Sequence, residues 1–77
     1  MKYKLRITYK GGSEVIFRSS HKKYLQNEYD IAVKKGMSPY VNDIIYIIYV
    51  ELSCKKWLSG EWVVIEQWSV NYAKSQA

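Results

Sequence analysis

The chain has few of the residues that build cross-links and metal sites. Its 77 residues include one cysteine, Cys54, one histidine, His21, and one proline. A single cysteine forms no internal disulfide, which fits a reducing cytoplasm, and Cys54 is expected to be a small buried apolar side chain. The motifs of zinc sites, phosphate-binding loops and dinucleotide-binding loops are absent, so we expect neither a metal nor a cofactor.

Long apolar runs are also missing. The longest, Ile44 to Val50, is far too short to cross a bilayer. Residues Met1 to Tyr9 alternate basic with apolar side chains and lack the uninterrupted apolar region of a signal peptide. We therefore expect a cytoplasmic protein without membrane contacts.

Acidic residues are few, whereas basic and aromatic residues are many. Twelve Lys and Arg stand against seven Asp and Glu, and the net charge is +5. Residues 1–36 hold nine of the basic residues against three acidic ones, so an anionic partner would meet this half first. Eight Tyr and three Trp exceed what one small core can hide. Such rings gather at protein interfaces and on nucleic-acid stacking surfaces, so the composition favours binding over catalysis.

The first 19 residues predict a β-hairpin. Apolar side chains alternate with polar ones from Lys2 to Tyr9, and a second strand follows from Glu14 to Ser19. A three-residue loop, residues 10–12, pairs Leu5 with Phe17 and Ile7 with Val15 and keeps charges off the apolar face. This loop also supplies glycine where a left-handed residue is required.

Residues 20–36 predict one helix. Ser20 is the expected N-cap, and Leu25, Tyr29 and Ala32 follow the spacing of a buried stripe. Two lysines and Gly36 then give the expected stop.

Residues 43–72 predict a second hairpin. With residues 58–60 as a three-residue loop, Val50 pairs with Trp68, Cys54 with Val64, and Glu51 with Gln67. The tail, 73–77, is expected to be frayed.

The expected fold is a single α+β domain with the order ββαββ. Four antiparallel strands form one sheet, and the helix packs on one face of it. The strand residues expected under the helix are Leu5, Ile7, Val15, Phe17, Ile48, Val50, Val64 and Trp68.

The uncovered face of the sheet is the candidate site. Its second-hairpin half is expected to be apolar and to bind a protein partner, either a foreign target or a second copy, through Ile45, Ile47, Tyr49, Val63 and Ile65. Its first-hairpin half is basic and suggests a single-stranded nucleic-acid alternative, using Lys2, Lys4, Arg6, Arg18 and Tyr49. Packing of the apolar half under the loop 37–43 or the tail is a third interpretation. A strand edge or the turn near Trp57 and Trp62 is another candidate contact surface.

An enzyme is not expected. His21 lies at the start of the helix beside two lysines, with no orienting carboxylate in prospect. Glu51 and Glu66 fall on opposite faces of the sheet in the expected register, so they cannot act as an acid and base pair.

The opening segment, Met1 to Glu14, resembles the first hairpin of many small accessory proteins encoded by phages and prophages of AT-rich bacteria. That resemblance implies a protein that occupies a host protein, defence machinery included, or handles nucleic acid. We therefore predict a non-enzymatic binding module that acts stoichiometrically, such as an inhibitor.

Overall fold

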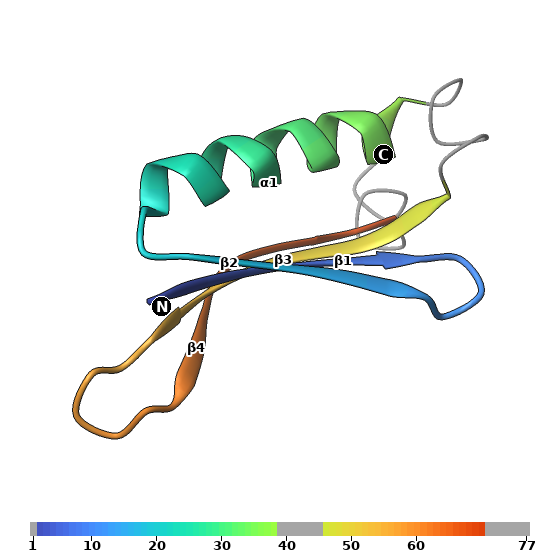
Figure 1. Cartoon of the computed structure of the whole chain (residues 1–77). Helices are drawn as coiled ribbons and strands as arrows, with labels where there is room; N and C mark the ends of the chain where they lie inside the picture. The colour runs from blue at the N-terminus through green and yellow to red at the C-terminus, as the bar shows by residue number, and fades with distance from the viewer. Residues whose placement is uncertain (1, 39–45, 71–77) are drawn as a thin grey trace.

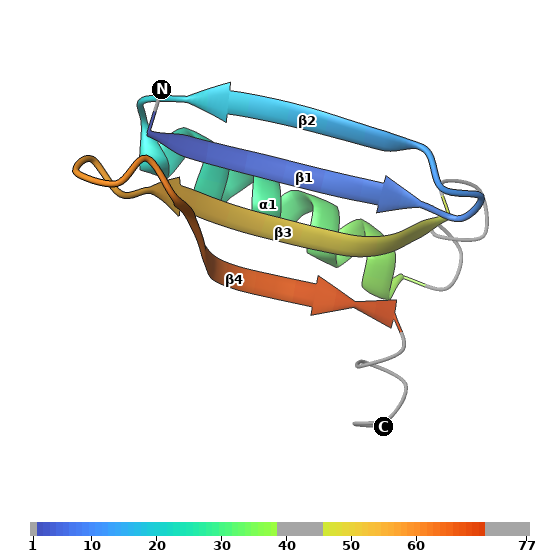
Figure 2. The ribbon, with the colours of Figure 1, turned by 90° about the horizontal axis from the view of Figure 1, so that it is seen from below.

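The computed structural model describes residues 2–38 and 46–70, and in them the α+β fold is confirmed. The elements are β1 (Tyr3–Tyr9), β2 (Glu14–Ser19), α1 (Lys22–Met37), β3 (Ile47–Lys55) and β4 (Trp62–Ser69). All neighbouring strands are antiparallel, and their order in the sheet is β2-β1-β3-β4. The helix forms a second layer on one face (Figure 1) and lies behind the central strands β1 and β3 in Figure 2. The predicted frayed tail, 73–77, and Ile45 lie outside the described residues.

The first hairpin has the predicted register. Leu5 pairs with Phe17 and Ile7 with Val15. The Tyr9 N–H donates a hydrogen bond to Ser13 O at 2.9 Å, and the Gly12 N–H donates one to Tyr9 O at 3.0 Å. These two bonds close a loop over residues 10–12. Gly11 and Gly12 have φ values of 101° and 96°, so this turn requires the left-handed freedom of glycine.

The helix begins and ends later than predicted. Its N-cap is His21, not Ser20, and the His21 N–H is bound by Ser19 Oγ at 3.0 Å. The helix continues through Gly36 to Met37, and Ser38 N–H closes the last turn on Lys34 O and Lys35 O. Gly36 is therefore not the predicted helix stop. It is buried under the Trp68 ring, where a side chain would collide with the indole.

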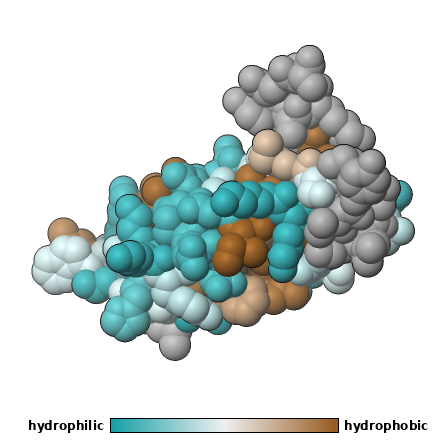
Figure 3. Space-filling view, turned by 90° about the horizontal axis from the view of Figure 1, so that it is seen from above, coloured by the Kyte–Doolittle hydropathy of each residue, from teal (hydrophilic) through white to brown (hydrophobic). Residues whose placement is uncertain are grey.

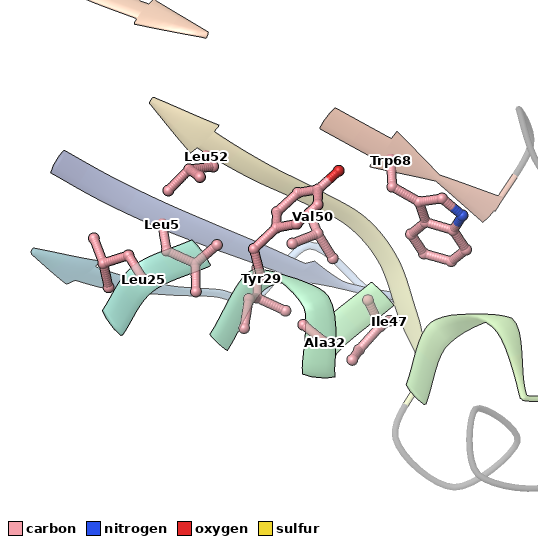
Figure 4. Packing of buried hydrophobic residues seen from close by; sticks show 9 residues of the cluster. Leu5, Leu25, Tyr29, Ala32, Ile47, Val50, Leu52 and Trp68 are labelled. Atoms are coloured by element: carbon pink, nitrogen blue, oxygen red, sulfur yellow. The ribbon is translucent and has the colours of Figure 1, made fainter. Parts of the chain in front are cut away.

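The core lies between α1 and the two central strands. Its members are Leu5, Ile7, Leu25, Tyr29, Ala32, Ile47, Val50, Leu52 and Trp68 (Figure 4). The prediction that the helix packs over Leu5, Ile7, Val50 and Trp68 is confirmed. Val15 and Phe17 were predicted under the helix but are exposed, because one helix over the centre of a four-stranded sheet leaves the edge strands partly open. Val64 was also predicted there, but it is exposed and pairs with Ser53, whose side chain lies on the face away from the helix.

The second hairpin departs from the predicted register at Ile65. Val50 pairs with Trp68 and Glu51 with Gln67 as predicted, but the register shifts after Leu52 and Cys54 meets Val63 rather than Val64. Ile65 is the extra residue of a β-bulge. The loop consequently spans residues 57–60, because Lys56 N–H donates to Glu61 O, and Gly60 is left-handed with φ 73°.

A second register shift lies on β3. Thr8 pairs with Tyr49 but Tyr9 pairs with Ile47, so Ile48 is skipped. The skip turns Ile47 toward the helix, where it is 2% exposed. Both shifts move side chains from the face that strict alternation assigns to them.

Candidate functional site

The sheet face away from the helix is polar along its centre. Arg6 pairs with Glu51, and Thr8 with Tyr49, on the two central strands. Tyr49 donates its hydroxyl to Glu51 Oε2 at 2.6 Å and also lies 3.1 Å from Gln67 Oε1. Ser53 Oγ donates to the other Glu51 oxygen at 3.2 Å. We call the side chains of Arg6, Tyr49, Glu51, Ser53 and Gln67 the central polar network.

Charge and burial set the protonation of this network. Burial, then the hydrogen bond to Glu51 and its negative charge, raises the pKa of Tyr49 to about 12. Arg6 Nε is buried without a hydrogen bond in the described part of the chain and lies 3.8 Å from Glu14 Oε2. Tyr49 therefore stays a neutral donor at physiological pH, and acidic side chains partly neutralise Arg6.

Trp62 forms a cationic and aromatic cluster at one end of the same face. Lys4 Nζ lies 4.4 Å from the Trp62 ring centre, and Lys55 Nζ lies 5.9 Å from it. Such contacts stabilise by about 0.5–1 kcal/mol at exposed sites. Lys4 lies on β1 and Lys55 on β3, and Arg18 of β2 pairs with Lys4, so a row of cations on three strands leads to the ring.

The structure brings together the residues of the nucleic-acid alternative. Lys4, Arg6, Arg18 and Tyr49 share the uncovered face, and Lys2 lies exposed just before β1. Two of them already interact with acidic side chains: Arg6 forms an ion pair with Glu14, and Tyr49 donates a hydrogen bond to Glu51.

The predicted apolar half of this face does not form in the described residues. Ile47 is a core residue on the helix side, so its placement on the uncovered face is wrong. Val63 pairs with Cys54 and points to the helix side, because the bulge at Ile65 reverses the alternation. Of the predicted set, only Tyr49 lies on the uncovered face by its strand pairing, and it lies in the central polar network.

The most exposed apolar side chains lie instead on the hairpin that joins β3 and β4. Trp57 and Leu58, in the loop, are 87% and 84% exposed. Val63, Val64 and Ile65 follow on edge strand β4 and are also exposed. We call these five residues the apolar arm; the hairpin that carries them extends away from the helix layer (Figure 1). The helix side, by contrast, is mostly hydrophilic, with hydrophobic atoms showing in a gap (Figure 3).

Sequence reasoning named the turn near Trp57 only as one candidate contact surface. A sharper signal was available, because loop positions favour Gly, Asn, Asp and Ser for reasons of backbone conformation. A Trp-Leu pair beside Ser59-Gly60 serves no such purpose.

Possible metal ligands and the two strand carboxylates lie apart in residues 2–38 and 46–70. No group of three His, Cys, Asp or Glu side chains is close enough there to hold a metal ion. Glu51 lies in the central polar network, while Glu66 accepts a hydrogen bond from Gln26 of α1 at 2.8 Å. The two carboxylates thus lie on opposite faces, as predicted. The hollow beside Ile31 and Phe17 measures about 190 Å³, below the usual size of a ligand pocket, whereas the hollow lined by Tyr49, Gln67, Trp68 and Ser69 measures about 390 Å³ and falls within that range.

The length and composition of α1 were compared with those of a membrane-spanning helix. Within the part of the chain that the structure describes, no helix has the length and apolar character needed to cross a bilayer.

Comparison with known proteins finds no matching family model, no matching curated protein and no matching solved structure.

Proposed function

We propose that this protein is a non-enzymatic binding module that acts stoichiometrically on a protein partner through the apolar arm. The observation that carries the proposal is the near-complete exposure of Trp57 and Leu58 at the end of an ordered hairpin. Tryptophan is the side chain most enriched among residues that dominate binding energy. Burying such side chains in a partner's pocket removes large apolar areas from water.

The hairpin itself does not need these two side chains. Its turn depends on Gly60, whose φ of 73° favours glycine, and on the backbone bond from Gly60 N–H to Lys56 O at 2.8 Å. Neither Trp57 nor Leu58 belongs to the hydrophobic core. Removing them should therefore change binding and leave folding unchanged.

A capture experiment tests this function. The wild-type chain, the double variant Trp57→Ser with Leu58→Ser, and the control Tyr24→Ser are immobilised and exposed to extracts of the cells that encode the protein. Tyr24 is a matched control because it is a large aromatic residue, 54% exposed, on α1. We expect one protein, held at a fixed molar ratio by the wild type and the control and lost by the double variant. Equal retention by all three chains would refute the assignment of the arm.

A second candidate function is single-stranded nucleic-acid binding at the Trp62 cluster. It is favoured by one specific observation, the cations Lys4 and Lys55 around an aromatic ring on an uncovered sheet face. Its affinity would fall with salt by roughly 0.7 log units per phosphate contact per decade. Trp62→Ala and Arg18→Ala would weaken it, and the apolar arm variants would not. No retention on oligonucleotides at low salt would discard it.

The opening hairpin's resemblance to phage and prophage accessory proteins supports a more specific proposal. The partner would be a protein of the host cytoplasm, and the module would inhibit it by blocking part of its surface. Expression of the wild-type chain and of the arm variant in the same host tests this proposal. Growth of the host or its defence against phage should change with the wild-type chain and stay unchanged with the arm variant.

A further inference from the structure

β2 is an edge strand whose outward backbone groups are defined by the turn before it. The bond from Tyr9 N–H to Ser13 O makes that pair hydrogen-bonded, and such pairs alternate along an antiparallel ladder. Val15 and Phe17 therefore bond to β1. Glu14, Ile16 and Arg18 point their N–H and C=O groups away from the sheet, along an edge where no other strand of residues 2–38 and 46–70 pairs.

The side chains of β2 complement those of a second, antiparallel β2. When two such strands meet with Ile16 opposite Ile16, Glu14 of each faces Arg18 of the other, and Val15 faces Phe17. The facing pairs at Glu14, Ile16 and Arg18 are the ones whose backbone groups point outward, so each can exchange two hydrogen bonds. The three apolar residues are 38%, 42% and 40% exposed in the single chain, so they have area left to bury.

The charges of the single chain also favour this partner. Arg18 lies directly opposite Lys4 on β1, and like charges in that arrangement destabilise a sheet. An acidic side chain beside Arg18 would relieve the repulsion. Glu14 is already on the same face, where it lies 3.8 Å from Arg6 Nε, so a second copy brings a carboxylate to the required face.

We propose that the protein forms a symmetric dimer by antiparallel pairing of β2 with β2 of a second copy, centred on Ile16. The two-fold axis runs perpendicular to the sheet, so both helices lie on one side and the sheet continues through both copies. Phe17 and Ile31, which line the hollow beside β2, then face the same hollow of the second copy. The apolar arms lie at the far edges, since β4 is the opposite edge strand.

Charge reversal tests the proposal. Light scattering after size exclusion should give twice the monomer mass of 9.1 kDa for the wild type. Arg18→Glu or Glu14→Arg alone places like charges at both ends of the pairing and should weaken dimerisation about tenfold or more. The two single variants mixed together, and the double variant Glu14→Arg with Arg18→Glu, restore opposite charges and should restore the dimer. Lys23→Glu, in the first turn of α1, changes the net charge by the same amount as Arg18→Glu; it is the control and should not affect the mass.

Two outcomes would overturn the proposal. One is a wild-type chain that keeps the monomer mass even at millimolar concentration. The other is a dimer that both single variants retain, or that neither the mixture nor the double variant restores. Circular dichroism of each variant shows whether it is folded. When both single variants are folded, recovery of the dimer mass on mixing them reports the charge pairing alone. The arm variant Trp57→Ser with Leu58→Ser should remain dimeric, so failure of this proposal leaves the proposed function standing and the reverse also holds.

Discussion

The contact between Gly36 and Trp68 gives the sharpest test of the packing. A Cβ at position 36 would lie 2.5 Å from Trp68 Cη2 and 2.6 Å from Cζ3, closer than real carbon contacts allow. The indole cannot swing freely because Trp68 is 8% exposed and packs in the core. Gly36→Ala should therefore force a shift in the core, even though alanine is the better helix former.

The magnitude follows from two opposing effects. Overpacking a core costs about 1–3 kcal/mol, and replacing a helical glycine by alanine gains about 1 kcal/mol. The net expectation is a loss of about 1 kcal/mol, which corresponds to a fall in Tm of about 4–8 °C for a domain of this size. In a Trp68→Phe background the far end of the indole is gone, and Gly36→Ala should then stabilise by up to about 1 kcal/mol.

Urea unfolding followed by far-ultraviolet circular dichroism measures all four chains of this cycle. The sign of the alanine effect should reverse between the two backgrounds, with a coupling of about 2 kcal/mol between positions 36 and 68. Gly12→Ala is a control, because nothing lies within 4 Å of its Cβ position while its φ is 96°. It should cost about 1–2 kcal/mol in both backgrounds. An alanine effect at position 36 that is the same with Trp and with Phe would refute the close packing.

Two further outcomes concern the uncovered face. Tyr49 should ionise near pH 12, and because this pKa exceeds the ordinary 10.0, its contribution to stability is complete below about pH 10 and is lost as pH rises toward 12. Glu51→Gln should lower that pKa, as read from phenolate absorbance with Tyr49→Phe as the reference; an unchanged titration would contradict the hydrogen bond. In double-mutant cycles with Trp62→Leu, followed by urea unfolding, the coupling of Lys4 to the ring should be about 0.5–1 kcal/mol and that of Lys55 smaller, because Lys4 Nζ is closer to the Trp62 ring. The opposite ranking would contradict the geometry.

Residue patterns were sufficient to predict the first hairpin. There, apolar residues occupy only one parity from Leu5 to Tyr9, and two adjacent glycines leave few possible turns. A one-residue shift of the register would have placed Arg18 and Glu14 on the helix side. The pairing of Leu5 with Phe17 follows directly, as does the grouping of Lys4, Arg6 and Arg18 on the uncovered face.

The second hairpin lacks that constraint. Ile47 and Ile48 are both apolar, as are Val63, Val64 and Ile65, so a one-residue shift replaces one hydrophobic residue by another at the same place. Periodicity cannot detect a bulge in such a run, because each face remains apolar in either register. The wrong placement of Ile47 and Val63 comes from this ambiguity.

The two bulges also explain why the apolar surplus is on the arm. The bulge at Ile48 turns Ile47 into the core and thereby fills the space under the end of α1. The bulge at Ile65 places Val64 opposite Ser53 and Val63 opposite Cys54, so apolar side chains appear on both faces of the outer part of β4. This outer part of β4 lies outside the hydrophobic core, so packing among the described residues gives no reason for apolar side chains on both of its faces. Bulges also increase local twist and bend the strand that carries them. The hairpin end is thus bent away from the helix layer and presents Trp57 and Leu58 outward, which is the arrangement that the proposed function needs.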